Sequence, residues 1–194
     1  MSDTLTYILL LILSYGIGCW STARLLAKTF RSLNIYKVGT GHPDTQNIYC
    51  NVDKSLGIFA GILDFSKIYI YLFILERVLN LMELNSLIAL LSLGFVMLVG
   101  HCLPVTHHFK GGRGVFTFMG LVMIFTPIPM LISGFIALVI TLRFVQHRFV
   151  QYVVVVLPAF LNLIFKESDI SMMFVLMILM GIINVFVSRS RGEI

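Results

Sequence analysis

Residues 114–146 read GVFTFMGLVMIFTPIPMLISGFIALVITLRFVQ, and the way this stretch folds decides how often the chain crosses a membrane. A bilayer core about 30 Å thick needs roughly 20 apolar residues per helix, so the stretch is too long for a single span. Pro127 and Pro129 each remove a helical hydrogen bond and disfavour the helical conformation of the residue before them. The sequence therefore predicts two short helices here, separated at the prolines.

The composition of the whole chain is that of a polytopic membrane protein. Of its 194 residues, 58% are hydrophobic and only 12% are charged, and the mean hydropathy is +0.97. Soluble domains are roughly 45–50% apolar, so a soluble fold is excluded, and five prolines and three cysteines exclude collagen-like and disulfide-framework chains. We expect an all-α fold in one integral membrane domain over residues 1–194. The seven predicted transmembrane helices lie near residues 5–27, 55–75, 84–103, 113–127, 129–145, 149–165 and 170–188.

The distribution of basic residues predicts the orientation of these helices. Short loops rich in Lys and Arg stay in the cytoplasm. With seven spans and the N-terminus outside, only Arg77 and Lys166 among the loop cations lie outside. Merging residues 114–146 into one span would move Lys166 inside but would move four arginines outside: Arg143, Arg148, Arg189 and Arg191. Seven spans with a cytoplasmic C-terminus therefore fit better.

The first long cytoplasmic loop, residues 28–54, contains Lys37, Gly39, Thr40 and Gly41. Glycines permit tight turns whose backbone amides point at an anion, and the lysine and the hydroxyl add further donors. The alternative is a solvated basic loop that only fixes the membrane topology.

The second cytoplasmic loop carries a sharper signal for anion binding. Lys110-Gly111-Gly112-Arg113-Gly114 opens the fourth predicted span. Unpaired amides at a helix start, the positive end of the helix dipole and two cations together suit a phosphate group. The order of residues differs from a Walker motif, and the alternative is topogenic charge with glycines for close helix packing.

Three titratable residues lie within or at the end of predicted spans, where they are costly and tend to be functional. His101 ends the third span, and Asp64 and Lys67 share one face of the second. The pair acts as a structural brace of the site or as a proton or ion relay, and we favour the brace. The adjacent His107 and His108 point in different directions, so we expect no metal site and no cofactor.

Two segments resemble motifs of the bacterial acyl-phosphate:glycerol-3-phosphate acyltransferase family. GHCLPVTHHFKGGRGVFTFMG at residues 100–120 is similar to the family's Gly-His-x-x-Pro followed by Phe-Lys-Gly-Gly-Lys-Gly-Val-Ala-Thr. ILDFSK at residues 62–67 resembles its Leu-Asp-x-x-Lys. Residues 36–47 match the family's Arg-Lys-x-Gly-Ser-Gly-Asn-x-Gly-Ala-Thr-Asn in part, and the C-terminal signature has no counterpart, so the chain is a divergent member.

The resemblance implies an enzyme of the bacterial inner membrane whose active site faces the cytoplasm. Its substrates would be acyl phosphate and glycerol 3-phosphate, acylated at the sn-1 hydroxyl to give lysophosphatidic acid for phospholipid synthesis. Its partners would be these substrates and membrane lipid, without nucleic acid. The phosphate-binding residues would be Lys37, Gly39, Thr40, Gly41, Asn47, Lys110, Gly111, Gly112, Arg113, Gly114 and Arg143.

The chemistry of an acyl phosphate explains why so few groups are needed. The donor is already an activated anhydride, so the site must hold two phosphates, orient the hydroxyl and offer a proton acceptor. We expect His101 to be the catalytic residue, either accepting the hydroxyl proton or orienting a substrate phosphate that does. The alternatives are a sibling acyltransferase with another phosphorylated acceptor, a catalytically silent member that binds acyl phosphate, and a small-ion transporter.

Overall fold

A computed structural model describes residues 3–81, 86–144 and 147–189, and within these ranges the chain contains helices and connections but no strand. The α-helices are α1 (Asp3–Gly18), α2 (Thr22–Arg31), α3 (Thr45–Asn51), α4 (Lys54–Leu81), α5 (Leu87–Cys102), α6 (Val115–Phe125), α7 (Pro127–Phe144), α8 (His147–Phe165) and α9 (Ile170–Arg189). Two 3-10 turns, η1 (Ile35–Lys37) and η2 (Val105–His107), lie in the connections.

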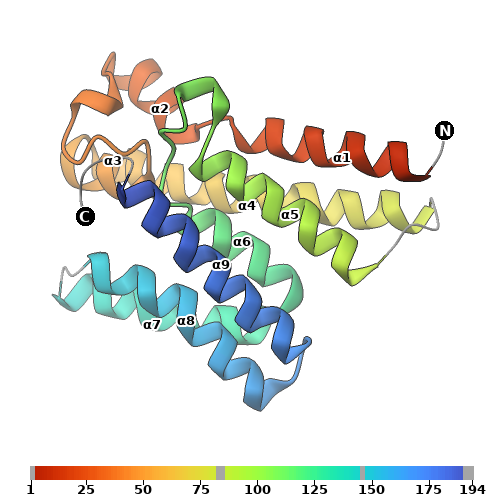
Figure 1. Cartoon of the computed structure of the whole chain (residues 1–194). Coiled ribbons are helices and arrows are strands. Elements are labelled where there is room, and N and C mark those ends of the chain that lie inside the picture. The colour runs from red at the N-terminus through yellow and green to blue at the C-terminus, as the bar shows by residue number, and fades with distance from the viewer. Residues whose placement is uncertain (1–2, 82–85, 145–146, 190–194) are drawn as a thin grey trace.

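Helices α1 and α4 to α9 form a bundle in which the chain direction alternates from one helix to the next (Figure 1). The short helices α2 and α3 and the connection from α5 to α6 gather at one end, where α9 also ends. Among the described residues, four stretches are long and apolar enough to cross a membrane: Thr4–Arg31, Lys54–Leu81, Leu87–His107 and Ile170–Arg189. The apolar helices in the α6, α7 and α8 regions are shorter. The count of seven spans and their orientation stay predictions.

The division of residues 114–146 into two helices is confirmed. Helix α6 ends at Phe125 and α7 begins at Pro127, the first helical position, where a missing amide hydrogen costs nothing. Thr126 joins them: its carbonyl accepts from the Met130 amide at 3.0 Å, and its hydroxyl donates to Val122 at 3.4 Å. The helices are therefore separated where the sequence predicts.

The helix expected over residues 5–27 is interrupted, which the sequence did not indicate. Helix α1 ends at Gly18, and α2 begins after Ser21, whose hydroxyl caps it by accepting from the Arg24 amide. The break follows the closest approach of α1 to α5: a Cβ on Gly18 would lie 2.2 Å from the Met97 carbonyl oxygen. Helix α2 buries only one face, so it lies along the end of the bundle.

Two hydrophobic clusters hold the fold. The larger joins α4, α5, α6 and α9 through residues such as Leu72, Met97, Leu121 and Met180, all without exposed surface. The smaller packs α2, η1 and α3 on the start of α4.

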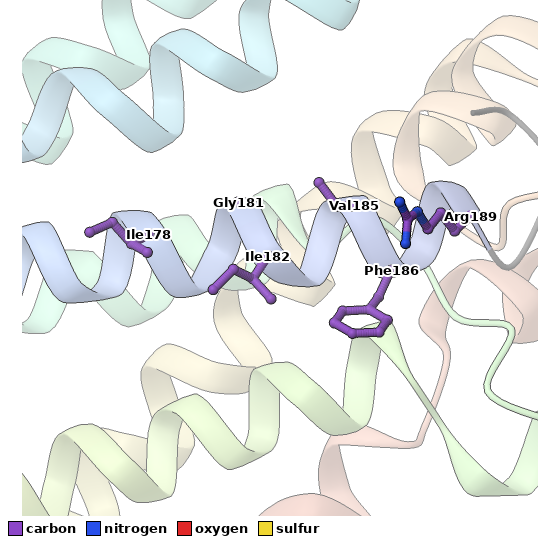
Figure 2. A pocket seen from close by; sticks show the side chains of 6 residues that line it. All are labelled: Ile178, Gly181, Ile182, Val185, Phe186 and Arg189. Carbon is purple, nitrogen blue, oxygen red and sulfur yellow. The ribbon is translucent and has the colours of Figure 1, made fainter.

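The outer faces of the bundle are themselves apolar. Figure 2 shows Ile178, Ile182, Val185 and Phe186 on α9, each about half exposed. A helix that is apolar on both its packed and its exposed faces is typical of a membrane span.

Candidate active site

A cavity of about 430 Å³ lies where the ends of α3, α5, α6, α7 and α8 meet the side of α4. One part of its wall is polar and consists of Asp44, Thr45, Gln46, Tyr49, Asp64, His101 and Arg113. The other part is mostly apolar and consists of Ile58, Ile62, Val115, Phe116, Met119, Ala137, Leu138, Val150 and Val154, with Gly114, Gly134, Thr141 and Gln151 between them. The cavity therefore joins a polar region to an apolar groove between helices.

His101 and Asp64 form the centre of the polar region. The last turn of α5 places His101 so that its Nδ1 lies 3.8 Å from Oδ1 of Asp64 on α4. Both side chains are 3% exposed, and Nδ1 has no hydrogen-bond partner among the described residues. On the other side of the ring, Nε2 faces Gly112, where an added Cβ would lie 3.0 Å from it. The imidazole thus lies between a buried carboxylate and the glycine loop.

Asp64 also connects α4 to the break between α1 and α2. Its Oδ1 accepts a hydrogen bond from the Thr22 hydroxyl and lies 3.9 Å from Lys67 Nζ. Lys67 donates in turn to the Trp20 carbonyl at 2.9 Å. A buried carboxylate needs such partners because leaving water is costly for a charge. The bracing role that we favour for the pair stays a prediction.

The glycines before α6 allow the loop to pack against the end of α5. A Cβ on Gly111 would lie 2.3 Å from the His101 carbonyl oxygen, and one on Gly114 would lie 2.5 Å from Cys102 Sγ. Gly114 has φ +72° and caps α6 without a side-chain hydrogen bond. The positive end of α6 therefore faces the cavity through Gly114, Val115 and Phe116.

Arg113 is the predicted phosphate-binding cation that lines the cavity. Its side chain is 7% exposed, and its guanidinium donates to Gln46 Oε1 at 3.5 Å. A fixed guanidinium beside a helix N-terminus suits recognition of a phosphate.

Asn47 organises the first glycine loop from within. Its Nδ2 donates to the carbonyls of Val38 at 2.9 Å and His42 at 2.8 Å, and its Oδ1 accepts from the Thr40 amide at 3.1 Å. The Gly41 amide donates to the Val38 carbonyl at 2.9 Å. Two amides predicted to contact phosphate are thus engaged inside the loop, and the described contacts of Asn47 shape the backbone.

The structure brings together only some of the predicted site residues. His101, Asp64, Arg113 and Gly114 line the cavity. Gly111 and Gly112 do not line it but pack against His101. The other predicted residues that do not line it are Lys37, Gly39, Thr40, Gly41, Asn47, Lys67, Lys110 and Arg143, of which Lys37, Gly39, Thr40, Lys110 and Arg143 are exposed.

Sequence reasoning missed the partners of these residues. Asp44, Thr45 and Gln46 enter the cavity because Asp44 caps α3, accepting from the Asn47 amide at 2.8 Å. An Asp before Thr-Gln-Asn is a recognisable helix start, so this signal was present. The apolar wall depends on how α7 and α8 pack on α6, which no local motif reveals.

Residues 8–192 match the family described as "Glycerol-3-phosphate acyltransferase". The chain belongs to this family. Three bacterial relatives carry the same name. Glycerol-3-phosphate acyltransferase 2 of Bacillus anthracis is 29% identical over 91% of this chain and 89% of its own length. The Nitrosospira multiformis protein is 32% identical over 71% of this chain and 68% of its own length. Glycerol-3-phosphate acyltransferase 5 of Dehalococcoides mccartyi is 30% identical over 67% of this chain and 54% of its own length, so this chain spans about half of that protein.

The fold agrees with this membership. The crystal structure of PlsY, an integral membrane glycerol 3-phosphate acyltransferase, in its glycerol 3-phosphate form superposes with a TM-score of 0.79 at 23% identity, covering 97% of this chain and 90% of PlsY. The lysophosphatidic acid form of PlsY superposes with a TM-score of 0.77 at 22% identity, covering 97% of this chain and 90% of PlsY. At this identity the likeness establishes the arrangement of the helices.

Proposed function

We propose that this protein transfers a fatty acyl group from acyl phosphate to the sn-1 hydroxyl of glycerol 3-phosphate, at the cytoplasmic face of a bacterial inner membrane. The observation that carries this proposal is the cavity. Its polar region contains His101 and Arg113, and it continues into an apolar groove between α4, α6, α7 and α8. An enzyme that joins a lipid chain to a phosphorylated polyol needs both environments within reach of one reacting centre.

The proposed reaction requires binding and one proton transfer. The acceptor hydroxyl oxygen attacks the acyl carbonyl carbon, the bond from that carbon to the phosphate oxygen breaks, and inorganic phosphate leaves. The hydroxyl proton goes to His101 Nε2 or to a substrate phosphate held beside it. Asp64 near Nδ1 stabilises the imidazolium that the first route forms.

The remaining groups hold the two anions and the chain. Arg113 and the start of α6 neutralise phosphate charge from one side of the cavity. Lys37, Lys110 and Arg143 are exposed, so they act as a surrounding positive field that attracts both substrates. The acyl chain lies along Ile62, Met119 and Leu138.

The test is acyl transfer by purified protein in lipid vesicles. With palmitoyl phosphate and glycerol 3-phosphate we expect lysophosphatidic acid and inorganic phosphate in equal amounts. His101→Ala should abolish both products, whereas His108→Ala, at an exposed histidine in the connection that follows α5, is the matched control. Absence of product with every phosphorylated acceptor would contradict the proposal, and product with another acceptor only would identify a sibling enzyme.

A further inference from the structure

Several glycines of the apolar helices are required by close helix packing. An added Cβ on Gly18, Gly100 or Gly120 would lie 2.2, 2.4 or 2.6 Å from a backbone oxygen of a neighbouring helix. Gly134 on α7 differs from these three, because among the described residues outside its own stretch of helix only one atom lies within 4 Å of its added Cβ, the terminal methyl of Met119, at 3.3 Å. No neighbouring backbone therefore requires a glycine at position 134.

Gly134 and Met119 lie at the inner end of the groove. On α6, α7 and α8 the lining residues farthest from the polar region are Met119, Gly134 and Val154. Further along the same helices, Val122, Met130 and Ala159 are buried in the main core, which closes the groove. From Thr141 to Gly134 the groove follows α7 for roughly 10 Å, the length of about eight extended methylene groups.

The side of the groove is open to the outside of the bundle. Ile58 and Ile62 on α4 are 57% and 55% exposed, and Leu138 on α7 is 54% exposed. Helix α4 packs on α3 and α6, whereas α7 packs on α6 and α8. A chain longer than the groove can therefore leave between α4 and α7 into lipid.

We propose that Gly134 and Met119 set how many methylene groups of the acyl donor the protein holds. This inference rests on the proposed function, because it assigns the groove to the donor chain. The missing side chain at position 134 leaves the inner end open, and the flexible Met119 thioether forms its floor. The acyl chain of a donor that is too short to reach this floor does not contact either residue.

The inference predicts opposite effects of two variants. Gly134→Val fills the inner end, so the preference for palmitoyl over hexanoyl phosphate, as a ratio of kcat/KM, should fall about tenfold. Met119→Ala removes the floor, so this ratio should rise and the best donor should become longer. The rate with hexanoyl phosphate should change less than the rate with palmitoyl phosphate in both variants.

The matched control is Gly181→Val on the outer face of α9, where an added Cβ meets no atom within 4 Å (Figure 2). It should leave the donor preference unchanged. Gly134→Ala adds one methyl group and gives a smaller shift of the same sign, which decides the matter if the valine variant fails to fold.

The outcomes separate the two proposals. A wild-type protein that forms no product with any donor overturns the proposed function. Two results would overturn only the role of the groove floor. In the first, the wild-type protein is active and its donor preference is unchanged in Gly134→Ala, Met119→Ala and Gly181→Val. In the second, a folded Gly134→Val protein loses equal activity with hexanoyl and palmitoyl donors.

Discussion

Oδ1 of Asp64 on α4 lies 3.8 Å from Nδ1 of His101 on α5, with both side chains enclosed by protein. Because Lys67 lies 3.9 Å from the same oxygen, one carboxylate faces the imidazole and the ammonium group. It can therefore influence both the reaction and the stability of the fold, and these two effects need separate measurements.

Asp64→Asn should lower kcat at least about tenfold with little change in KM, because the imidazolium loses its counter-charge. It should also destabilise the fold, since it leaves Lys67 as a buried charge without its carboxylate. The double variant Asp64→Asn/Lys67→Met removes both charges. We expect it to regain thermal stability but not activity, and recovery of both would contradict a role of Asp64 in the reaction.

Arg113→Lys should raise KM for glycerol 3-phosphate about tenfold, because an ammonium group cannot make the two parallel bonds of a guanidinium. Arg143→Lys is the control, as Arg143 is exposed at the end of α7 and does not line the cavity. Equal effects of the two substitutions would show that phosphate binding is not concentrated at Arg113.

Lys110→Ala should reduce kcat/KM about threefold at low ionic strength, and the difference from wild type should shrink at high salt. An exposed charge attracts anions through a field that salt screens within about 10 Å. A loss that persists in high salt would place Lys110 in direct contact with bound substrate.

Asn47→Ala should destabilise the protein by about 2–3 kcal/mol, because several loop carbonyls and the Thr40 amide lose their partner. Asn47→Asp should do no better, since a carboxylate would face carbonyl oxygens. The matched control is Asn184→Ala on α9, whose side chain makes one bond, to the Met180 carbonyl. Thermal unfolding and proteolysis between residues 36 and 44 would measure the difference.

Acid should remove one contribution to stability at the start of α4. Asp53 accepts from the Leu56 amide at 3.0 Å and pairs with Arg31, and these contacts lower the pKa of its carboxyl group. Because the folded pKa lies below the unfolded one, the stabilisation is present above about pH 4 and is lost as the pH falls through the folded value. Wild type should therefore unfold at a higher temperature than Asp53→Asn at pH 7, and this difference should narrow in acid. A constant difference would contradict the assignment.

The sequence predicts helices well where local chemistry marks their ends. Pro127 and Pro129 separate α6 from α7 as expected, because a missing amide hydrogen acts within the segment itself. The break between α1 and α2 was missed, because it accompanies the contact of Gly18 with α5, eighty residues away, while Cys19 and Trp20 continue the apolar pattern.

The site was predictable to the same degree. His101 was predicted because it is a titratable residue at the end of an apolar span, and Arg113 because it stands among the glycines that pack on α5. The glycines of a loop do not indicate which way the loop faces. Lys37 and Thr40 are exposed because Asn47 holds the loop through hydrogen bonds from its buried side. Gln46 and Gln151 reach the cavity only through packing between distant segments.

The cysteines differ in a way that offers a direct view of the site. Cys19 and Cys102 are buried, whereas Cys50 is exposed on α3, the short helix whose cap lines the cavity. Partial burial and the nearby Asp44 raise the pKa of the Cys50 thiol, so its labelling should accelerate as the medium becomes alkaline. A single fluorophore attached there would report substrate arrival without any engineered residue.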